Sequence, residues 1–214
     1  MSECSINAML DLETLGNGPQ ALIKQIGVAI FCEQRLEVLD SLQIDIDPAS
    51  HQAMGGQIDA ATINWWLDQP QAARARMQLS GMHIAKALDQ TTAFLAKHAS
   101  LNDIKVWGND PSFDLTILRS AYRATGHDDQ PWQYFNQRCY RTLKAMHPSI
   151  GKPREGTLHI AADDALSQAH HVVKILKHQG QQRDQLAFLH TLTPEQLDRV
   201  KAFAVQVTEE KEAI

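Results

Sequence analysis

Hydrophobic and polar positions in the first fifty residues follow the pattern of β-strands. A mostly apolar run over residues 5–10 leads into acidic residues and then into the turn sequence Gly16-Asn17-Gly18-Pro19, which is typical of a buried strand that ends in a turn. Residues 20–32 predict a second strand and residues 36–46 a third, joined by a hairpin at residues 33–35. These three segments therefore predict an antiparallel start to a sheet.

The helical period dominates the middle of the chain. Residues 62–69 and 71–79 predict two helices split by Pro70, and residues 83–98 predict a longer amphipathic helix. Residues 104–108 then read as another strand, followed by a loop and a helix. Strands first, then helices, then a strand and further helices predict an α/β domain with a mixed β-sheet flanked by α-helices.

The last third of the chain predicts two helical segments. A helix that begins near Asp163 is expected to stop at Gly180, because glycine is the residue most often found just after a helix end. Thr193 as N-cap and Pro194 at the first helical position predict a final helix. We expect one domain over residues 1–180 and a helical extension over residues 181–214 that packs on it.

Composition agrees with one globular domain. The chain has 214 residues, of which 43% are hydrophobic, enough for one core. It has no apolar run of about 18–20 residues and no basic, then apolar, N-terminus, so neither a membrane span nor a secretory signal is expected. Cys4, Cys32 and Cys139 lie far apart without C-x-x-C spacing. We therefore expect a cytoplasmic protein whose cysteines pack or have no role.

Two acidic residues at the end of the first strand are candidate metal ligands. Successive side chains of a strand alternate faces, so Asp11 and Glu13 lie on one face and Leu12 on the other. Two neighbouring carboxylates repel each other unless cations lie between them, and hard cations such as Mg²⁺ prefer oxygen ligands. The alternative is a pair of surface acids at a strand end.

Two later patches supply further candidates. Asp114 lies in the opening turns of the helix after residues 104–108, where it either belongs to a site or complements the helix dipole; for Asp110 we favour a capping role. His159 precedes the start of the helix near Asp163, and Asp164 lies in the first turn of that helix, so the histidine can lie over a site that Asp164 helps to build. We interpret the histidines at 170, 171 and 178 as ordinary helix residues.

These patches together resemble the DEDDh-type 3′–5′ exonucleases, the family that includes ribonuclease T, oligoribonuclease and polymerase proofreading subunits. The likeness rests on three motifs in the family's order: Asp11-x-Glu13, Asn109-x-x-x-Phe113-Asp114 and His159-x-x-x-x-Asp164. More narrowly, the chain resembles the phage DexA and mycobacterial exoribonuclease-like group over most of residues 5–180. The resemblance implies a ribonuclease H-like fold.

The resemblance also implies a ligand set, a base and a reaction. Two Mg²⁺ or Mn²⁺ ions would be held by Asp11, Glu13, Asp114 and Asp164. His159 would act as general base in the hydrolysis of phosphodiester bonds from the 3′ end of single-stranded DNA or RNA, with release of nucleoside 5′-monophosphates. Asp164 is chosen over Asp163 because it alone has the family spacing from the histidine.

Substrate contacts are implied for a smaller set of residues. The end of the nucleic acid would meet Thr14, Leu15, Asn109 and Trp66. Of the adjacent Trp65 and Trp66, one is expected in the core and the other stacks on a base or packs. The aromatic stretch over residues 132–142 carries arginines and fits either a single-strand channel or the core.

The formal net charge of −5 is unusual for a nucleic-acid partner, because phosphate binding depends on Lys and Arg. Bound cations would offset the acids of the site. A basic rim is expected from the second half of the chain: Lys105, Arg119, Arg123, Arg138, Arg141, Lys144, Lys152 and Arg154. Each is equally well interpreted as part of a solvated face.

Other functions and assemblies remain open at this point. The same site with a shorter pocket fits hydrolysis of small or modified nucleotides, and loss of activity would leave a silent nucleic-acid binder. Residues 181–214 either close the core or form a homodimer contact, since several relatives of this kind are dimers. No membrane partner is expected.

Overall fold

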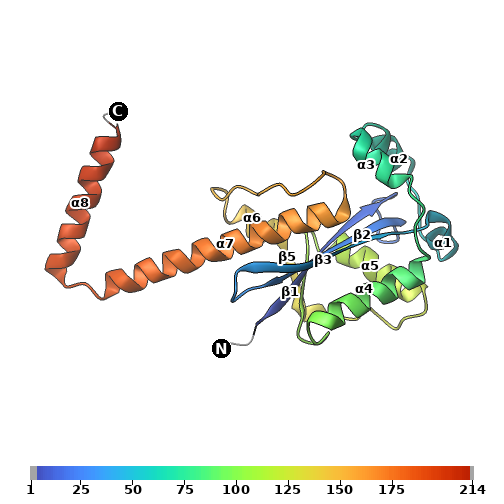
Figure 1. The fold of residues 1–214 in the computed structure, drawn as a ribbon, viewed down its shortest axis with the longest axis horizontal. Helices are drawn as coiled ribbons and strands as arrows, with labels where there is room; N and C mark the ends of the chain where they lie inside the picture. The colour runs from blue at the N-terminus through green and yellow to red at the C-terminus, as the bar shows by residue number, and fades with distance from the viewer. Residues whose placement is uncertain (1–3, 213–214) are drawn as a thin grey trace. The chain divides into compact units, whose positions relative to one another are not determined.

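A mixed five-stranded sheet forms the centre of the fold in the computed structural model, which describes residues 4–212 (Figure 1). The strand order is β3-β2-β1-β4-β5. Strands β1, β2 and β3 pair antiparallel, whereas β4 pairs parallel with β1 and β5 parallel with β4. The strands are β1 (Ile6–Thr14), β2 (Ile23–Cys32), β3 (Glu37–Asp45), β4 (Lys105–Gly108) and β5 (Gln137–Cys139).

Helices fill the connections and confirm most of the predicted elements. They are α1 (Pro48–Ala53), α2 (Ala60–Leu67), α3 (Gln71–Met77), α4 (Ile84–His98), α5 (Asp114–Ala124), the 3₁₀ helix η1 (Tyr134–Asn136), α6 (Tyr140–Ala145), α7 (Ala161–His190) and α8 (Pro194–Glu212). Sequence analysis did not predict α1, η1, β5 or α6. Each spans six residues or fewer, which is too short to show a hydrophobic period.

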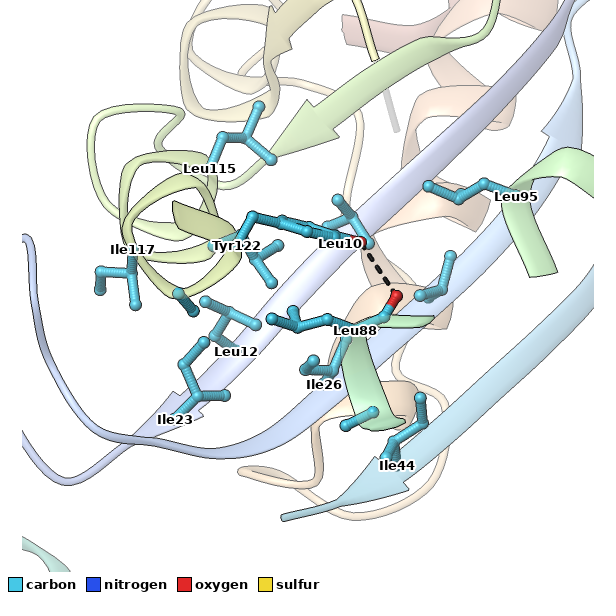
Figure 2. Close-up of a cluster of buried hydrophobic side chains, with 14 of the residues drawn as sticks. Leu10, Leu12, Ile23, Ile26, Ile44, Leu88, Leu95, Leu115, Ile117 and Tyr122 are labelled. Atoms are coloured by element: carbon cyan, nitrogen blue, oxygen red, sulfur yellow. Dashed lines mark hydrogen bonds between the residues drawn. The ribbon is translucent and has the colours of Figure 1, made fainter. Parts of the chain in front are cut away.

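The main core lies on one face of the sheet, beneath α4 and α5. Leu10 and Leu12 of β1 point into it, and the hydroxyl of buried Tyr122 donates to the carbonyl oxygen of Leu88 at 3.2 Å (Figure 2). Asp11 and Glu13 alternate with these leucines, as predicted. They therefore occupy the opposite face, where the first turns of α7 pack.

Helix α7 continues through Gly180, so the predicted stop there was wrong. Glycine ends a helix when it adopts a left-handed conformation. Among the described residues the glycines with positive φ are Gly55, Gly126 and Gly156, and Gly180 remains helical. A glycine inside a helix costs about 1 kcal/mol relative to alanine, which one long helix tolerates.

The described part of the chain divides into two compact units, with the boundary between Ile175 and Leu176. The second unit contains the later part of α7 and all of α8. The start of α8 has the predicted N-cap at Thr193, which forms a capping box with Gln196: the Thr193 hydroxyl accepts from the amide of Gln196 at 3.3 Å, and the Gln196 side chain accepts from the amide of Thr193 at 2.9 Å. In the part of the chain that the structure describes, every helix is too short or too polar to cross a membrane.

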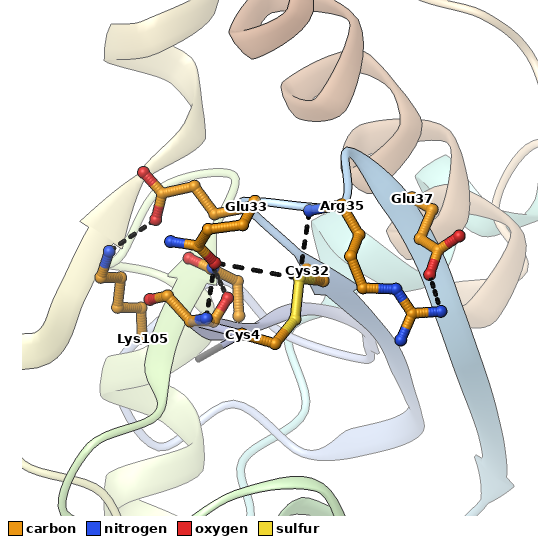
Figure 3. Close-up of a disulfide and its surroundings, with 9 residues drawn as sticks. Cys4, Cys32, Glu33, Arg35, Glu37 and Lys105 are labelled. Atoms are coloured by element: carbon orange, nitrogen blue, oxygen red, sulfur yellow. Dashed lines mark hydrogen bonds and ion pairs between the residues drawn. A yellow bond between two sulfur atoms is a disulfide. The ribbon is translucent and has the colours of Figure 1, made fainter. Parts of the chain in front are cut away.

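Two cysteines have a role that the sequence analysis did not predict. Cys4 and Cys32 form a disulfide, with their Cα atoms 5.9 Å apart (Figure 3). They lie 28 residues apart in sequence, but the antiparallel register places Ile6 opposite Cys32 and so brings the two cysteines together. The prediction that these cysteines only pack or have no role was wrong. Cys139 is free, and its sulfur accepts from the amide of Thr142 at 3.4 Å.

Candidate active site

All four candidate carboxylates and the candidate histidine line one cleft, where β1 and β4 end. Its volume is about 270 Å³. The cleft is lined by Asp11, Leu12, Glu13, Asn109, Asp110, Phe113, Asp114, Arg141, Lys152, Leu158, His159, Asp164 and Gln168. Three segments that are far apart in sequence thus meet at one end of the sheet.

Strand β1 positions the first two carboxylates. Asp11 and Glu13 lie on the same face, and Glu13 is buried with 7% of its surface exposed. The Nε2 atom of Gln168 in α7 donates to Oδ1 of Asp11 at 2.6 Å. The side chains are therefore enclosed in the cleft rather than exposed at a strand end, which removes the surface alternative.

Asp114 is the first residue of α5 and is buried, with 4% of its surface exposed. The backbone amide of Asp110 donates to its Oδ2 at 3.4 Å. Asp110 itself has the predicted capping role: its Oδ1 accepts from the amide of Ser112 at 3.0 Å and from the Ser112 hydroxyl at 2.6 Å. Of the two acids, only Asp114 is surrounded by the other carboxylates.

The start of α7 contributes Asp164. Its Oδ2 accepts from the backbone amide of His159 at 2.8 Å, and its Oδ1 accepts from the Arg154 guanidinium at 2.6 Å. Neighbouring Asp163 instead accepts from the amide of Thr157 at 2.7 Å. Asp164 therefore lines the cleft, whereas Asp163 contacts the preceding loop; the assignment of Asp164 as a metal ligand stays a prediction.

The imidazole of His159 is held between acids and aromatic rings. Its Nδ1 lies 3.9 Å from Oε1 of Glu13, and its ring meets Trp65 and Trp66 edge-on at centroid distances of 4.9 and 5.9 Å. The backbone of His159 has a φ of 62°, which turns its amide toward Asp164. One ligand atom each of Glu13, His159 and Asp164 lie within 4.8 Å of one another.

Enclosure in the cleft disfavours the charged forms of three of the carboxylates, Asp11, Glu13 and Asp114. Burial, together with the charges of Asp114, Glu13 and Asp164, raises the pKa of Asp11 well above its usual value. Burial and the neighbouring acids raise the pKa of Glu13 to about 8, and burial raises that of Asp114 to about 6. Burial lowers the pKa of His159, which favours a neutral imidazole. Four oxygen ligands with unfavourable mutual repulsion fit hard divalent cations.

A second hollow is linked to the acid cleft by Trp66, which lines the hollow and whose ring centroid lies 5.9 Å from that of His159 in the cleft. It has a volume of about 460 Å³, and Leu15, Trp66 and residues of α2 and α3 line it. Trp66 is 6% exposed, and its indole nitrogen donates to the carbonyl oxygen of Thr14 at 2.8 Å, whereas Trp65 is 44% exposed. The Thr14 hydroxyl donates to the carbonyl oxygen of Gly16 at 2.7 Å. Of the four predicted substrate residues, Leu15 and Trp66 thus share this hollow, and Asn109 lies in the acid cleft.

The structure also shows residues that sequence analysis missed, at the start of α7. Oε1 of Gln25 accepts from the amide of Ala161 at 3.1 Å, and Oε1 of Gln43 accepts from the amide of Ala162 at 2.8 Å. At Gly27 the backbone of α7 lies so close that a Cβ atom would be 2.1 Å from Ala161. These strand residues set the position of the helix that carries Asp164. The sequence offered no signal for them, because the burial of Gln25 and the contact of Gln43 with α7 depend on how distant elements pack.

The predicted basic rim is mostly used elsewhere. Lys105 pairs with Glu33 at 2.6 Å, and Arg119 pairs with Asp129 at 2.6 Å. Arg123 also contacts Asp129, and Arg138 donates to backbone carbonyl groups. Three of the eight lie at the acid cleft: Arg141, Lys152 and Arg154.

The aromatic stretch after Pro131 divides between core and surface. Trp132 and Tyr140 are buried, with 2% and 1% of their surface exposed, as the core interpretation requires. Tyr134 and Phe135 are exposed in η1. Neither of these two lines the acid cleft, whereas Arg141 of the same stretch does.

The mixed sheet and the cleft that joins Asp11, Glu13, Asp114, Asp164 and His159 have the arrangement that the resemblance to DEDDh-type 3′–5′ exonucleases implies. The chain belongs to the Rv2179c-like 3′–5′ exoribonuclease domain family, whose model matches residues 6–176. The predicted enzyme class is therefore confirmed, while the narrower likeness to phage DexA stays a prediction. No protein of curated function matches the chain.

Solved structures confirm the ribonuclease H-like fold. The nuclease domain of 3′hExo, a DEDDh family member bound to rAMP, matches with a TM-score of 0.59 and 15% identity over 83% of this chain and 94% of that one. The E. coli exonuclease I–ssDNA complex in its zinc-bound form matches with a TM-score of 0.61 and 15% identity, over 88% of this chain and 43% of that one. Cell-death related nuclease 4 matches with a TM-score of 0.58 and 12% identity, over 81% and 64% of the two chains.

Proposed function

We propose that this protein removes nucleotides one at a time from the 3′ end of single-stranded RNA or DNA and releases nucleoside 5′-monophosphates. The observation that carries the proposal is the meeting of Asp11, Glu13, Asp114, Asp164 and His159 in one cleft. The family's description as 3′–5′ exoribonucleases supports the direction of attack and favours RNA.

The four carboxylates would hold two divalent ions, Mg²⁺ or Mn²⁺. Such ions stabilise the negative charge that develops on a phosphate and on the departing 3′ oxygen. The protein fixes the positions of two of these ligands by short hydrogen bonds. Gln168 donates to Asp11, and Arg154 donates to Asp164. His159, held beside Glu13, would take the proton of the attacking water on its imidazole.

The neighbouring hollow would receive the 3′-terminal nucleoside. Its volume of about 460 Å³ lies within the range of small-molecule pockets, about 300–1,000 Å³. Leu15 and Trp66 give it an apolar wall, and Trp66 fixes the backbone of Thr14 that joins the hollow to the metal ligands. Asn109 in the acid cleft would contact the terminal sugar or phosphate.

The proposal also covers the domain organisation of the chain, its self-association and its location in the cell. We propose an exonuclease domain over residues 1–180 and a helical extension over residues 181–214, with self-association of two chains as part of the working hypothesis. A cytoplasmic location also belongs to it. The disulfide between Cys4 and Cys32 would be reduced in that compartment, so the fold must be stable with both thiols free.

The proposal predicts a ladder of products. Incubating 5′-labelled single-stranded RNA and DNA oligomers with Mg²⁺ or Mn²⁺ should give fragments that shorten from the 3′ end by one nucleotide, and EDTA should stop the reaction. Mass spectrometry of the released product should show nucleoside 5′-monophosphates. Oligomers that stay intact with both metals would contradict the proposal, and internal cuts would contradict its direction.

Replacing His159 with alanine is expected to lower the rate by about 10²–10⁴-fold, because that is the usual contribution of a general base. Mn²⁺ affinity should stay unchanged, since the side chain is assigned to proton transfer and not to the metal ions. Single-turnover kinetics and calorimetric Mn²⁺ titration measure the two quantities. His170→Gln is the matched control, because His170 lies outside the cleft on α7. Equal activity of His159→Ala and wild type would remove the base assignment.

A further inference from the structure

Gln168 joins the two elements that carry the candidate metal ligands. It lies on α7 four residues after Asp164, so the two side chains share a helix face. Its Nε2 atom donates to Oδ1 of Asp11 on β1 at 2.6 Å, across a sequence separation of 157 residues. The side chain is 4% exposed and lines the acid cleft.

In the described part of the chain, the hydrogen bond that the structure shows for the amide of Gln168 is the one to Asp11. Among the described residues its Oε1 is buried without a hydrogen-bond partner. A buried polar atom without a partner costs about 1–3 kcal/mol, so the Oε1 atom by itself disfavours burial of this side chain. The effect of this amide on the cleft is therefore the hydrogen bond that orients Asp11.

A neutral donor suits a carboxylate that must bind cations. A lysine or arginine beside Asp11 would offset the negative charge that attracts a metal ion, as Arg154 does at Asp164. An amide N–H fixes the orientation of the carboxylate and leaves its charge intact. Partners of this kind orient metal ligands, and their removal typically costs about 10–100-fold in metal affinity or activity.

We propose that Gln168 is a positioning residue for the cation site: it holds Asp11 in the orientation that binds a divalent ion. This inference rests on the proposed function. It adds to the four carboxylates and His159 a residue that none of the three sequence motifs contains.

Gln168→Met tests the inference, because methionine keeps the length of the side chain and removes the donor. Calorimetric titration with Mn²⁺ should show about 10–100-fold weaker binding. The melting temperature of the metal-free variant should stay close to that of the wild type, because removal of the unpartnered Oε1 offsets the loss of the donor to Asp11. The KM for an RNA oligomer should not change at saturating Mn²⁺.

Gln130→Met is the matched control. Gln130 is also buried with an unpartnered Oε1, but its Nε2 donates to the carbonyl oxygen of Trp132 and not to an acid. Its Mn²⁺ affinity should equal that of the wild type. Gln168→Leu provides a second shape and should show the same loss, which keeps the test valid should the methionine variant fail to fold.

Each outcome decides the inference. Weaker Mn²⁺ binding in both Gln168 variants, with unchanged binding in Gln130→Met, supports it. Unchanged Mn²⁺ binding in the Gln168 variants, or a lower melting temperature with unchanged binding, overturns it and leaves the proposed function intact. A wild-type protein that binds no Mn²⁺ overturns both.

Discussion

Replacing Asp11 with asparagine is expected to lower exonuclease activity by more than about 10³-fold. Bound metal ions lower the activation free energy by several kcal/mol, and each 1.36 kcal/mol that is lost slows the reaction about tenfold. Asparagine keeps an oxygen that can accept the hydrogen bond of Gln168, so the shape of the cleft is retained while the charge is lost. The same change should raise the melting temperature of the metal-free protein, because it relieves the repulsion among four enclosed carboxylates. Activity assays and thermal unfolding in EDTA measure both effects.

The gain in melting temperature should depend on pH. Burial and neighbouring acids raise the pKa of Glu13 from 4.5 to about 8, so folding favours its protonated form. A raised pKa of an acid stabilises the fold at low pH, and this contribution is lost as the pH rises toward the folded-state value. The difference between Asp11→Asn and wild type should therefore be small near pH 4 and largest above pH 8, and saturating Mn²⁺ should reverse its sign.

Asp163→Asn is the control for this prediction. Asp163 neighbours Asp164 in sequence, yet its carboxylate accepts from the amide of Thr157, a contact that asparagine can keep. Activity near that of the wild type is expected. An inactive Asp163→Asn together with an active Asp11→Asn would show that the ligand set is wrongly assigned.

Local patterns were sufficient to predict the ligand-bearing strand. Asp11 and Glu13 follow from the period of two in β-strands, which needs no information from the rest of the chain. The choice of Asp164 over Asp163 rested on the spacing from His159, and the structure places the two side chains accordingly. The first inference depends on one strand alone, whereas the second needs the spacing of the family that the chain resembles.

Contacts between elements that are far apart in the sequence could not be predicted from local patterns. Gln25 and Gln43 cap α7 because three strands pair in a particular register and a helix more than 100 residues later packs on them. The disulfide between Cys4 and Cys32 depends on the same register. Gly180 shows that a residue type alone does not decide where a helix ends. Glycine permits a helix to stop, but α7 continues past it to His190.

Gly27→Ala is expected to destabilise the protein, because α7 packs on the sheet at this residue. Gly27 lies in the middle of β2, paired with Asp11, and an added Cβ would lie 2.1 Å from both the carbonyl carbon and oxygen of Ala161 and 2.4 Å from the nitrogen of Ala162. These are backbone atoms, so no side-chain rotation can relieve the contact and the start of α7 must move. Overpacking usually costs about 1–3 kcal/mol and occasionally more, and we expect the upper end here.

Movement of α7 should also disable the site, because the helix start carries Asp164 and the preceding loop carries His159. A displacement of about 1 Å can cost roughly 10²-fold in rate, so Gly27→Ala should lose activity beyond its loss of stability. Urea unfolding followed by circular dichroism gives the free energy of unfolding, and the ladder assay on the folded fraction gives the rate. Gly18→Ala is the control, since a Cβ there meets nothing within 4 Å, and its stability should change by less than about 1 kcal/mol. If Gly27→Ala matched Gly18→Ala in both measurements, close packing of α7 against β2 would not be what positions Asp164 and His159.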